Sequence, residues 1–334
     1  TYEKFLPYIN NGFDFSEMLS ELLGELNVSH TGSTYWGNGY TLSTACLGLF
    51  FDPAYEGDGL KVQEVLRRGP FDVRNTKVKA GDIIEAIDGE KIEAGKDYNA
   101  MLDGKVGRPV RVMLKGGREV VVKPISSGEQ SKLLYRRWVD RNKAMVDKWS
   151  NGQIAYVHVK AMDSESFRTV FSELLSDSNR QKKAVIVDER HNGGGWLHDD
   201  LCTLLSGRQY QSFVPRGQFI GWDPWNKWVK PSCVLVCEDD YSNGHGFPYV
   251  YQKLGIGPVI GAPVAGTMTA VWWETMLDGQ TVFGIPQVGC LGMDGKYGEN
   301  QTLIPDITVY NTPEQQLSGD DQQLRRAVEE MLKK

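Results

Sequence analysis

Several features that define common classes of protein are missing from this sequence of 334 residues. No apolar run approaches the roughly 18 to 20 residues that a membrane-spanning helix needs, so we expect no membrane partner. Lys and Arg number 37 against 43 Asp and Glu, which gives a net charge of −6, and no basic block stands out. We therefore expect no nucleic-acid partner either. The length is sufficient for two or more domains with substantial cores.

Cysteine is also scarce. The five cysteines are an odd number at scattered positions, which is not the pattern of a disulfide framework. Cys233 and Cys237 lie on one face of an expected strand with no second ligand pair nearby, and His191 and His198 lie on opposite sides of a glycine turn. The sequence therefore predicts no zinc site, no other metal site and no cofactor.

An initiating methionine and a signal-peptide pattern are absent as well. The chain begins at Thr1, which suggests a processed or excised piece of a longer protein.

The strongest chemical signal lies in residues 232–251. Val234 to Cys237 is a short apolar run typical of a buried strand, and residues 247–254 have the pattern of a helix. A polar corner with Ser242 lies between them. A serine at a sharp strand-to-helix turn has its hydroxyl held outward, and the next amide, that of Asn243, can stabilise an oxyanion at the helix N-terminus. Ser242 is thus the leading nucleophile candidate, although such a serine taken alone is more often a helix cap.

A similar strand, turn and helix precede this corner. Residues 184–188 form an expected buried strand, and three successive glycines, Gly193 to Gly195, follow before a helix. Such glycines let the backbone approach a ligand closely with free amides. No Walker lysine or Gly-x-Gly-x-x-Gly spacing accompanies them. The turn therefore fits an oxyanion hole better than a phosphate site, with Gly194 and Gly195 as candidate donors beside Asn243.

Two further candidates lie far from this corner in the sequence. An amphipathic helix expected within residues 1–28 ends before Ser29-His30, which offers a base and a neighbouring hydroxyl. Glu299 lies in a loop shortly before Pro305-Asp306. Each is an ordinary loop residue by default.

Residues 45–126 resemble a PDZ domain. The stretch Leu47 to Phe50 is similar to the carboxylate-binding loop of that family, and Ala80 to Ile84 with Asp88-Gly89 is similar to its central strands. Such a domain binds an extended peptide at a sheet edge, with loop amides on a C-terminal carboxylate. The candidate substrate-binding residues here are Gly48, Leu49 and Phe50. The alternative is an occluded groove in a domain that only braces its neighbours.

Together these stretches resemble the S41 serine peptidases, in which a PDZ domain precedes an α/β domain with the glycine turn and the serine turn in this order. The tail-specific processing members pair the serine with a downstream lysine, and Thr267 stands where that lysine is expected. Tricorn-type members instead use a Ser-His pair before the PDZ domain, the serine, and a glutamate close before a Pro-Asp. Ser29-His30, Ser242 and Glu299 match that pattern in position and order.

The resemblance implies a chemistry for these residues. His30 would accept the proton of Ser242, and Glu299 would orient the imidazole directly or through the Ser29 hydroxyl. The amides of the glycine turn and of the residue after the serine would bind the oxyanion. The implied enzyme is a serine peptidase that hydrolyses oligopeptides or unfolded polypeptides through an acyl-enzyme.

The implied fold is α+β and multidomain. It consists of an N-terminal helical segment over residues 1–44 that carries the Ser-His pair, a PDZ-like β domain over 45–126, a linker helix over 127–150, and an α/β domain over 151–334 with the ββα spiral of ClpP and crotonases. Tricorn-type peptidases carry β-propellers ahead of the matching stretch and form rings. This sequence contains no propeller repeat, which puts ring assembly and exopeptidase behaviour in doubt and leaves a homo-oligomer as an option. The resemblance favours a cytoplasmic location, with the periplasm as the alternative.

Aromatic residues are concentrated between the two turns, at Trp196, Tyr210, Phe213, Phe219, Trp222, Trp225 and Trp228. We expect part of this set, Phe213 included, to line pockets for apolar substrate side chains. A subunit interface or plain core is the alternative. Two rival functions stay open: an inactive PDZ-type peptide-binding scaffold, and a crotonase-like enzyme that stabilises a thioester enolate.

Overall fold

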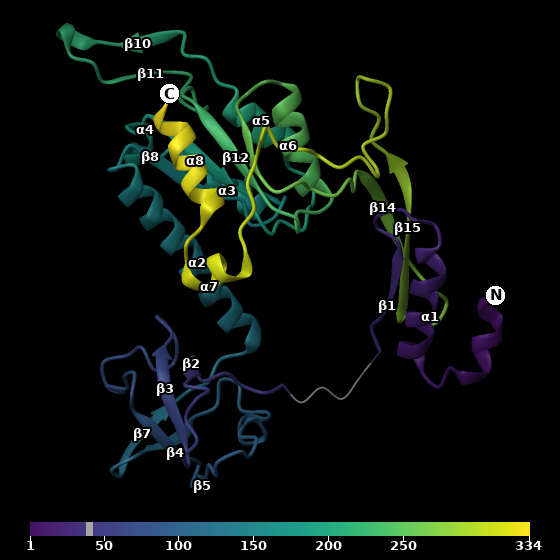
Figure 1. Cartoon of the computed structure of the whole chain (residues 1–334), viewed down its shortest axis with the longest axis vertical. Helices are drawn as coiled ribbons and strands as arrows, with labels where there is room; N and C mark the ends of the chain where they lie inside the picture. The colour runs from purple at the N-terminus through teal and green to yellow at the C-terminus, as the bar shows by residue number, and fades with distance from the viewer. Residues whose placement is uncertain (38–42) are drawn as a thin grey trace. The chain divides into compact units, whose positions relative to one another are not determined.

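The computed structural model describes residues 1–37 and 43–334, which form two compact units (Figure 1). The first unit combines the two ends of the chain, Thr1–Asn38 and Asn142–Lys334, and the second is Gly39–Arg141. The N-terminal residues thus fold with the C-terminal part of the chain, and the division into the four expected segments stays a prediction. Within the described ranges, no helix is both long enough and apolar enough to cross a bilayer.

A five-stranded parallel sheet forms the centre of the first unit. Its order is β16-β13-β12-β9-β8. The strands are β8 (Ile154–His158), β9 (Ala184–Asp188), β12 (Ser232–Val236), β13 (Val259–Gly261) and β16 (Ile307–Thr308). Every residue of β8, β9 and β12 is buried, as expected for strands covered on both faces.

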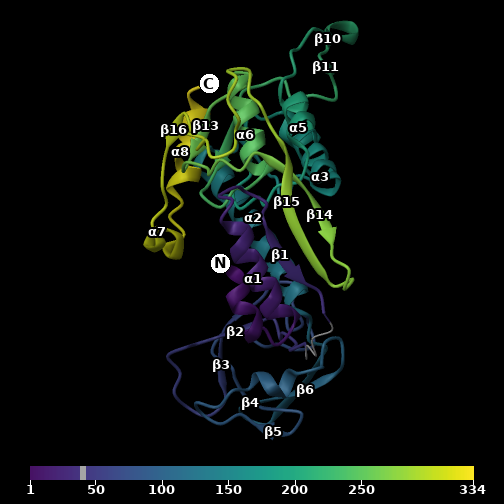
Figure 2. The ribbon, with the colours of Figure 1, turned by 90° about the vertical axis from the view of Figure 1, so that its right-hand side faces the viewer.

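Helices cover both faces of this sheet. They are α3 (Ser164–Leu174), α5 (His198–Leu205), α6 (Asn243–Lys253) and α8 (Gln322–Leu332). The short helix α4 (Asp177–Arg180) packs on α3, and α7 (Pro313–Ser318), which has no buried residue, precedes α8 in the chain. Apolar side chains of α3, α5 and α6 share one core with alternate residues of the sheet, such as Val187 and Val234. Helix α8 contacts four of the five strands and lies on the other side of the sheet from α3 and α5 (Figure 2).

An antiparallel ribbon continues the first unit. Strands β14 (Thr269–Thr275) and β15 (Thr281–Gly289) form its hairpin, and β1 (Gly32–Tyr35) pairs with β15. Helix α1 (Gly12–Gly24), preceded by the 3₁₀ helix η1 (Tyr2–Tyr8), packs on β1 (Figure 1). The sequence predicted only helix in this N-terminal segment, so β1 is an addition to the expected structure.

A second hairpin extends from the core of the same unit. It consists of β10 (Gln211–Phe213) and β11 (Gly221–Asp223), with the 3₁₀ turn η3 (Pro215–Gly217) between them. Figures 1 and 2 both show it projecting beyond the sheet and its helices. We call residues 206–230 the arm.

The second unit is built on an antiparallel sheet of order β2-β3-β4-β6-β7. The strands are β2 (Leu49–Phe51), β3 (Leu60–Val65), β4 (Ile83–Ile87), β6 (Val110–Leu114) and β7 (Arg118–Val122), with β5 (Glu90–Lys91) paired to β4 and η2 (Asn99–Leu102) nearby in the chain. Gly48 enters β2 with φ of +66°, and a Cβ there would lie 2.7 Å from Cδ of Pro70. Because β2 is at the edge of the sheet, it is available for a further strand. Helix α2 (Ser127–Trp149) leads from this unit into the first.

A buried ion-pair cluster joins the central sheet of the first unit to α8. Arg190 follows β9 and donates two hydrogen bonds to Asp188, at 2.9 and 2.7 Å. The same guanidinium donates to both carboxylate oxygens of Asp321, at 3.0 and 2.8 Å. Asp321 also caps α8 by accepting a hydrogen bond from the Leu324 amide. All three charged side chains are buried, so the loss of one leaves a desolvated charge without part of its compensation.

We predict that Asp321→Ala lowers the free energy of unfolding of the first unit by about 3 kcal/mol or more, since it removes a buried partner and a helix cap. The neighbouring Asp320 pairs with Arg325 at the surface, and Asp320→Ala should cost less than about 1 kcal/mol. Urea unfolding followed by Trp fluorescence measures both, because every Trp except Trp138 belongs to the first unit. Equal losses in the two variants would contradict this account.

Candidate active site

Ser242 lies at a strained turn between β12 and α6. Its backbone has φ of 56° and ψ of −119°, a region that non-glycine residues rarely occupy. Helix α6 begins at Asn243, directly after the serine and four residues before the start that the sequence predicted. The Ser242 amide donates a hydrogen bond of 2.7 Å to the Thr267 hydroxyl. Thr267, which stands where the resemblance to tail-specific peptidases would place a lysine, is thus an anchor of the turn.

The glycine turn after β9 packs directly against this serine. Gly194 has φ of +96°, and a Cβ on it would lie 2.6 Å from Cβ of Ser242. Gly195 has φ of +132°, and a Cβ there would lie 2.2 Å from the Met162 carbonyl oxygen. Neither position has room for a side chain, so the close approach of the two turns requires glycine at both.

The amides of the two turns differ in availability. The Gly194 amide already donates a 2.9 Å hydrogen bond to Oδ1 of Asn192, so it is not free for an oxyanion. Among the described residues, no acceptor is found for the amides of Gly195 and Asn243. Gly193 and Gly195 line the cavity beside Ser242, whereas Gly194 does not. The geometry therefore favours Gly195 and Asn243, and it speaks against the expected contribution of Gly194.

His30 lies beside the serine although it is 212 residues away in the sequence. Its Nε2 is 2.8 Å from Oγ of Ser242. The backbone of His30 has φ of 61°, and its amide donates a 2.7 Å hydrogen bond to the Tyr241 hydroxyl. The Tyr241 ring also contacts the imidazole, with the ring centroids 4.9 Å apart. Tyr241 therefore holds His30 in two ways, through the main-chain amide and through the contact with the imidazole ring.

A relay of hydrogen bonds connects the other ring nitrogen of His30 to Glu299. The Ser29 hydroxyl lies 2.9 Å from Nδ1 of His30 and donates to Oε2 of Glu299 at 2.9 Å. The Ser29 amide donates to the second carboxylate oxygen at 2.6 Å. A hydroxyl that donates to the carboxylate must accept from Nδ1–H, which leaves Nε2 as an acceptor for the Ser242 hydroxyl proton. This is the tautomer that a general base needs.

Sequence reasoning missed Thr269, the first residue of β14. Its hydroxyl lies 2.8 Å from the Ser29 hydroxyl and 3.0 Å from Nδ1 of His30, so it shares the relay. A single threonine at the start of a strand carries no pattern that distinguishes it from an ordinary β residue. Tyr241 was missed for a similar reason, since only the fold brings its hydroxyl to the His30 amide.

Burial lowers the pKa of His30 below its ordinary value of 6.5, and the negative charge of Glu299 opposes this shift. Burial is the larger effect because it penalises the charged imidazolium. The imidazole therefore stays neutral, and able to accept a proton, to a lower pH than an exposed histidine does.

A cavity of about 350 Å³ opens beside Ser242. Its apolar lining consists of Trp196, Met268, Ala270 and Val271, and none of its described lining residues is Asp, Glu, Lys or Arg. From the expected aromatic set, Trp196 lines this cavity. Trp228 is buried in the core, and Phe213 lies on β10 of the arm and not in the cavity lining.

The expected peptide-binding loop belongs to the second unit. Gly48 precedes the edge strand β2, Leu49 is buried, and the ring of Phe50 lies 5.5 Å from the guanidinium of Arg137. Their role stays a prediction.

Comparison with known proteins places this arrangement in a family. The model of peptidase family S41 matches residues 153–309, and the model of the tricorn protease PDZ domain matches residues 53–127. The chain thus contains an S41 peptidase domain and a tricorn-type PDZ domain. The matching ranges include both the glycine turn and Ser242, and the PDZ match covers all the described strands of the second unit except β2.

Whole-chain relatives are tricorn proteases. The tricorn protease of Thermoplasma acidophilum is 26% identical over 99% of this chain, and tricorn protease homolog 1 of Streptomyces coelicolor is 28% identical over 98%. The chain spans about a third of their length, 32% in each case. A crystal structure of the tricorn protease superposes on 99% of this chain with a TM-score of 0.85 at 24% identity. The superposed part is 33% of the chain in that structure. The expected fold class, a PDZ-type β domain combined with an S41 α/β domain, is thereby confirmed.

We predict that the reactivity of Ser242 rises with pH through a midpoint below 6.5, because the base must be neutral and burial lowers the pKa of His30. The rate of labelling by a fluorophosphonate, measured from pH 4 to about pH 8, reports this midpoint. Glu299→Gln removes the charge that raises the pKa, so its midpoint should fall further. Glu165→Gln on the exposed face of α3 serves as the control. A wild-type midpoint above 6.5, or a rise in Glu299→Gln, would refute the assignment.

Proposed function

We propose that this chain is a serine peptidase that cleaves peptide bonds through an acyl-enzyme on Ser242. The observation that carries the proposal is the 2.8 Å contact between Nε2 of His30 and Oγ of Ser242, supported by the relay from Nδ1 through the Ser29 hydroxyl to Glu299. The match of residues 153–309 to the model of peptidase family S41 supports the same reaction. The proposal depends on the contact between the two residues, because a serine or a histidine by itself would not indicate a peptidase.

In the first step, Oγ of Ser242 attacks the carbonyl carbon of the scissile bond while its proton passes to Nε2 of His30. The resulting imidazolium is stabilised by Glu299 through the Ser29 hydroxyl. His30 then gives the proton to the leaving amine as the C–N bond breaks, which leaves an ester on Ser242. Water, deprotonated by the same imidazole, hydrolyses that ester and restores the serine.

The oxyanion of each tetrahedral intermediate is placed between the amides of Gly195 and Asn243. Removal of one such donor typically costs about 3 kcal/mol of barrier. The side chain of Asn243 supports this role indirectly: its Oδ1 accepts hydrogen bonds from the amides of Leu197 and His198 at 2.8 and 3.0 Å. It thereby ties the start of α5, just after the glycine turn, to the start of α6. Substitution of Asn243 would disturb the hole through this link even though the donor itself is a backbone amide.

Extended peptides with an apolar residue before the scissile bond are the substrates that we propose. The apolar cavity lining supports this, as does the absence of a charged side chain among its described residues. The relatives' name, tricorn protease, supports peptide substrates in general. The edge strand β2 supports capture of an extended peptide by the PDZ-type unit. Assembly with further copies of the chain stays a prediction from the family.

We predict that Ser242→Ala and His30→Ala each reduce turnover of a peptide library by at least about a thousandfold, because each removes a group that acts in both chemical steps. Ser318→Ala, an exposed serine in α7, is the matched control and should retain full activity. Near-normal rates in either test variant would remove that residue from the mechanism. Wild-type protein that neither hydrolyses peptides nor reacts with a fluorophosphonate would support the scaffold alternative instead.

We predict that peptide amides with Leu or Phe before the scissile bond give a kcat/KM at least about tenfold above those with Arg or Asp, since burial of an apolar side chain is worth about 1–3 kcal/mol. Val271→Asp, which introduces a carboxylate into the cavity lining, should reduce this preference and favour Arg. A clear wild-type preference for Arg or Asp would reject the apolar pocket.

A further inference from the structure

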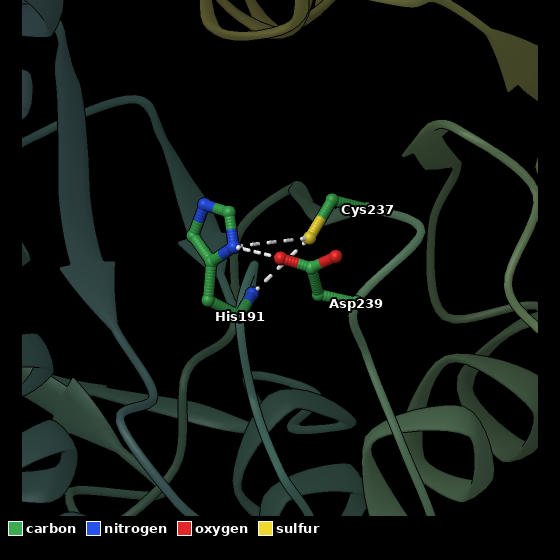
Figure 3. A group of neighbouring side chains, drawn as sticks. All are labelled: His191, Cys237 and Asp239. Atoms are coloured by element: carbon green, nitrogen blue, oxygen red, sulfur yellow. Dashed lines mark hydrogen bonds and ion pairs between the residues drawn. The ribbon is translucent and has the colours of Figure 1, made fainter.

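Three side chains outside the hydrogen-bond relay meet where β9 and β12 end (Figure 3). His191 follows β9, and Cys237 and Asp239 follow β12. One ligand atom from each lies within 4.8 Å of the other two. Nδ1 of His191 is 2.8 Å from Oδ2 of Asp239 and 3.7 Å from Sγ of Cys237. Figure 3 shows Nδ1 of the imidazole facing both the thiol and the carboxylate.

The backbone holds these groups together. Strands β9 and β12 are parallel neighbours, with Asp188 paired to Leu235, so the loops that carry the three residues leave the same edge of the sheet. The His191 amide donates a 3.2 Å hydrogen bond to Sγ of Cys237, which fixes the histidine over the thiol. An N–H donor to sulfur is also the contact that supports a metal-bound thiolate.

The separations suit a tetrahedral ion. Zinc bonds of about 2.0–2.1 Å to nitrogen, 2.3 Å to sulfur and 2.0–2.2 Å to oxygen place neighbouring donors about 3.3–3.7 Å apart. The Nδ1 to Sγ distance already agrees. The Nδ1 to Oδ2 distance must open by about half an ångström, and the Asp239 side chain, 70% exposed, has the freedom to do this. A nitrogen, sulfur and oxygen donor set selects zinc-class ions over Ca²⁺ and Mg²⁺, which prefer oxygen alone.

We propose that His191, Cys237 and Asp239 bind a divalent ion of the zinc class, with water in the fourth position. The imidazole and the carboxylate are exposed, at 57% and 70%, and Cys237 is buried behind them, so the ion enters from solvent and meets the thiol last. The thiol proton is released to solvent as the sulfur–metal bond forms.

The ion would join the two turns that form the candidate active site. His191 precedes Asn192, which accepts a hydrogen bond from the Tyr241 amide and holds the Gly194 amide. Asp239 lies three residues before Ser242. Coordination thus adds a further connection between these turns, and it stabilises the folded chain because the unfolded chain lacks the preformed site. Sequence analysis considered Cys237 and His191 separately and predicted no metal site, because only the fold brings these two residues together with Asp239.

The site is tested with cobalt as a spectroscopic substitute for zinc, added to the full chain in reducing, metal-free buffer. We expect one equivalent of Co²⁺ to produce thiolate-to-cobalt charge-transfer absorption and tetrahedral d–d bands. His191→Ala and Asp239→Ala, both at exposed positions, should each weaken Co²⁺ binding by at least about tenfold. Glu238→Ala, at the exposed residue between two of the ligands, and Cys46→Ala, at a thiol in the second unit, should leave it unchanged.

Thermal unfolding with Zn²⁺ gives an independent readout. The Tm of the wild type should rise with Zn²⁺ and that of His191→Ala should not. The proposal is overturned if the wild type shows no charge-transfer band, if the band keeps its affinity in both ligand variants, or if Zn²⁺ stabilises wild type and His191→Ala equally. Neither readout involves peptide hydrolysis, so the outcome is separate from that of the proposed peptidase function.

Discussion

The antiparallel pairing of β1 with β15 determines where the imidazole lies. His30 stands two residues before β1, and the register from Gly32 opposite Gly284 sets its place along the ribbon. A shift by one residue would turn every β1 side chain to the other face. Gly284 also permits the approach, because a Cβ there would lie 3.0 Å from the His30 carbonyl oxygen. The proposed chemistry thus depends on a strand of four residues whose partner is about 250 residues away.

The second requirement is that β9 and β12 are neighbours in a parallel sheet. Parallel neighbours end at the same edge, which is where α/β proteins place their sites. Asp240, almost fully buried, accepts hydrogen bonds from the amides of Asn192 and Cys237 and so staples the two turns together. The unfavourable backbone conformation of Ser242 is maintained because these contacts, together with the hydrogen bond to Thr267, fix the residues on both sides of it.

The parts of the structure that could be predicted from sequence are those with a local signal. Buried strands such as β9 and β12, the glycine turn and the serine corner follow from apolar runs and from the special backbone freedom of glycine. The pairing of Ser29-His30 with Glu299 came from a resemblance, and no residue pattern alone would have given it. Thr269, Tyr241 and strand β1 were missed because their significance arises only from long-range pairing. For Gly194 the glycine run predicts a free amide, and only the fold shows that the side chain of Asn192 accepts its hydrogen bond.

A comparison with His245 gives a physical reason for the proposal that the base comes from so far away in the sequence. His245 is only three residues after Ser242, yet it lies in the first turn of α6, where the helix dipole disfavours an imidazolium. Burial lowers the pKa of His245 to about 4, so it resists taking up a proton near neutral pH. His30 comes from outside the helix, is less buried, and reaches the Glu299 carboxylate through one hydroxyl. A base must accept a proton and stabilise the resulting charge, and of these two histidines His30 fits both conditions better, which supports its proposed role.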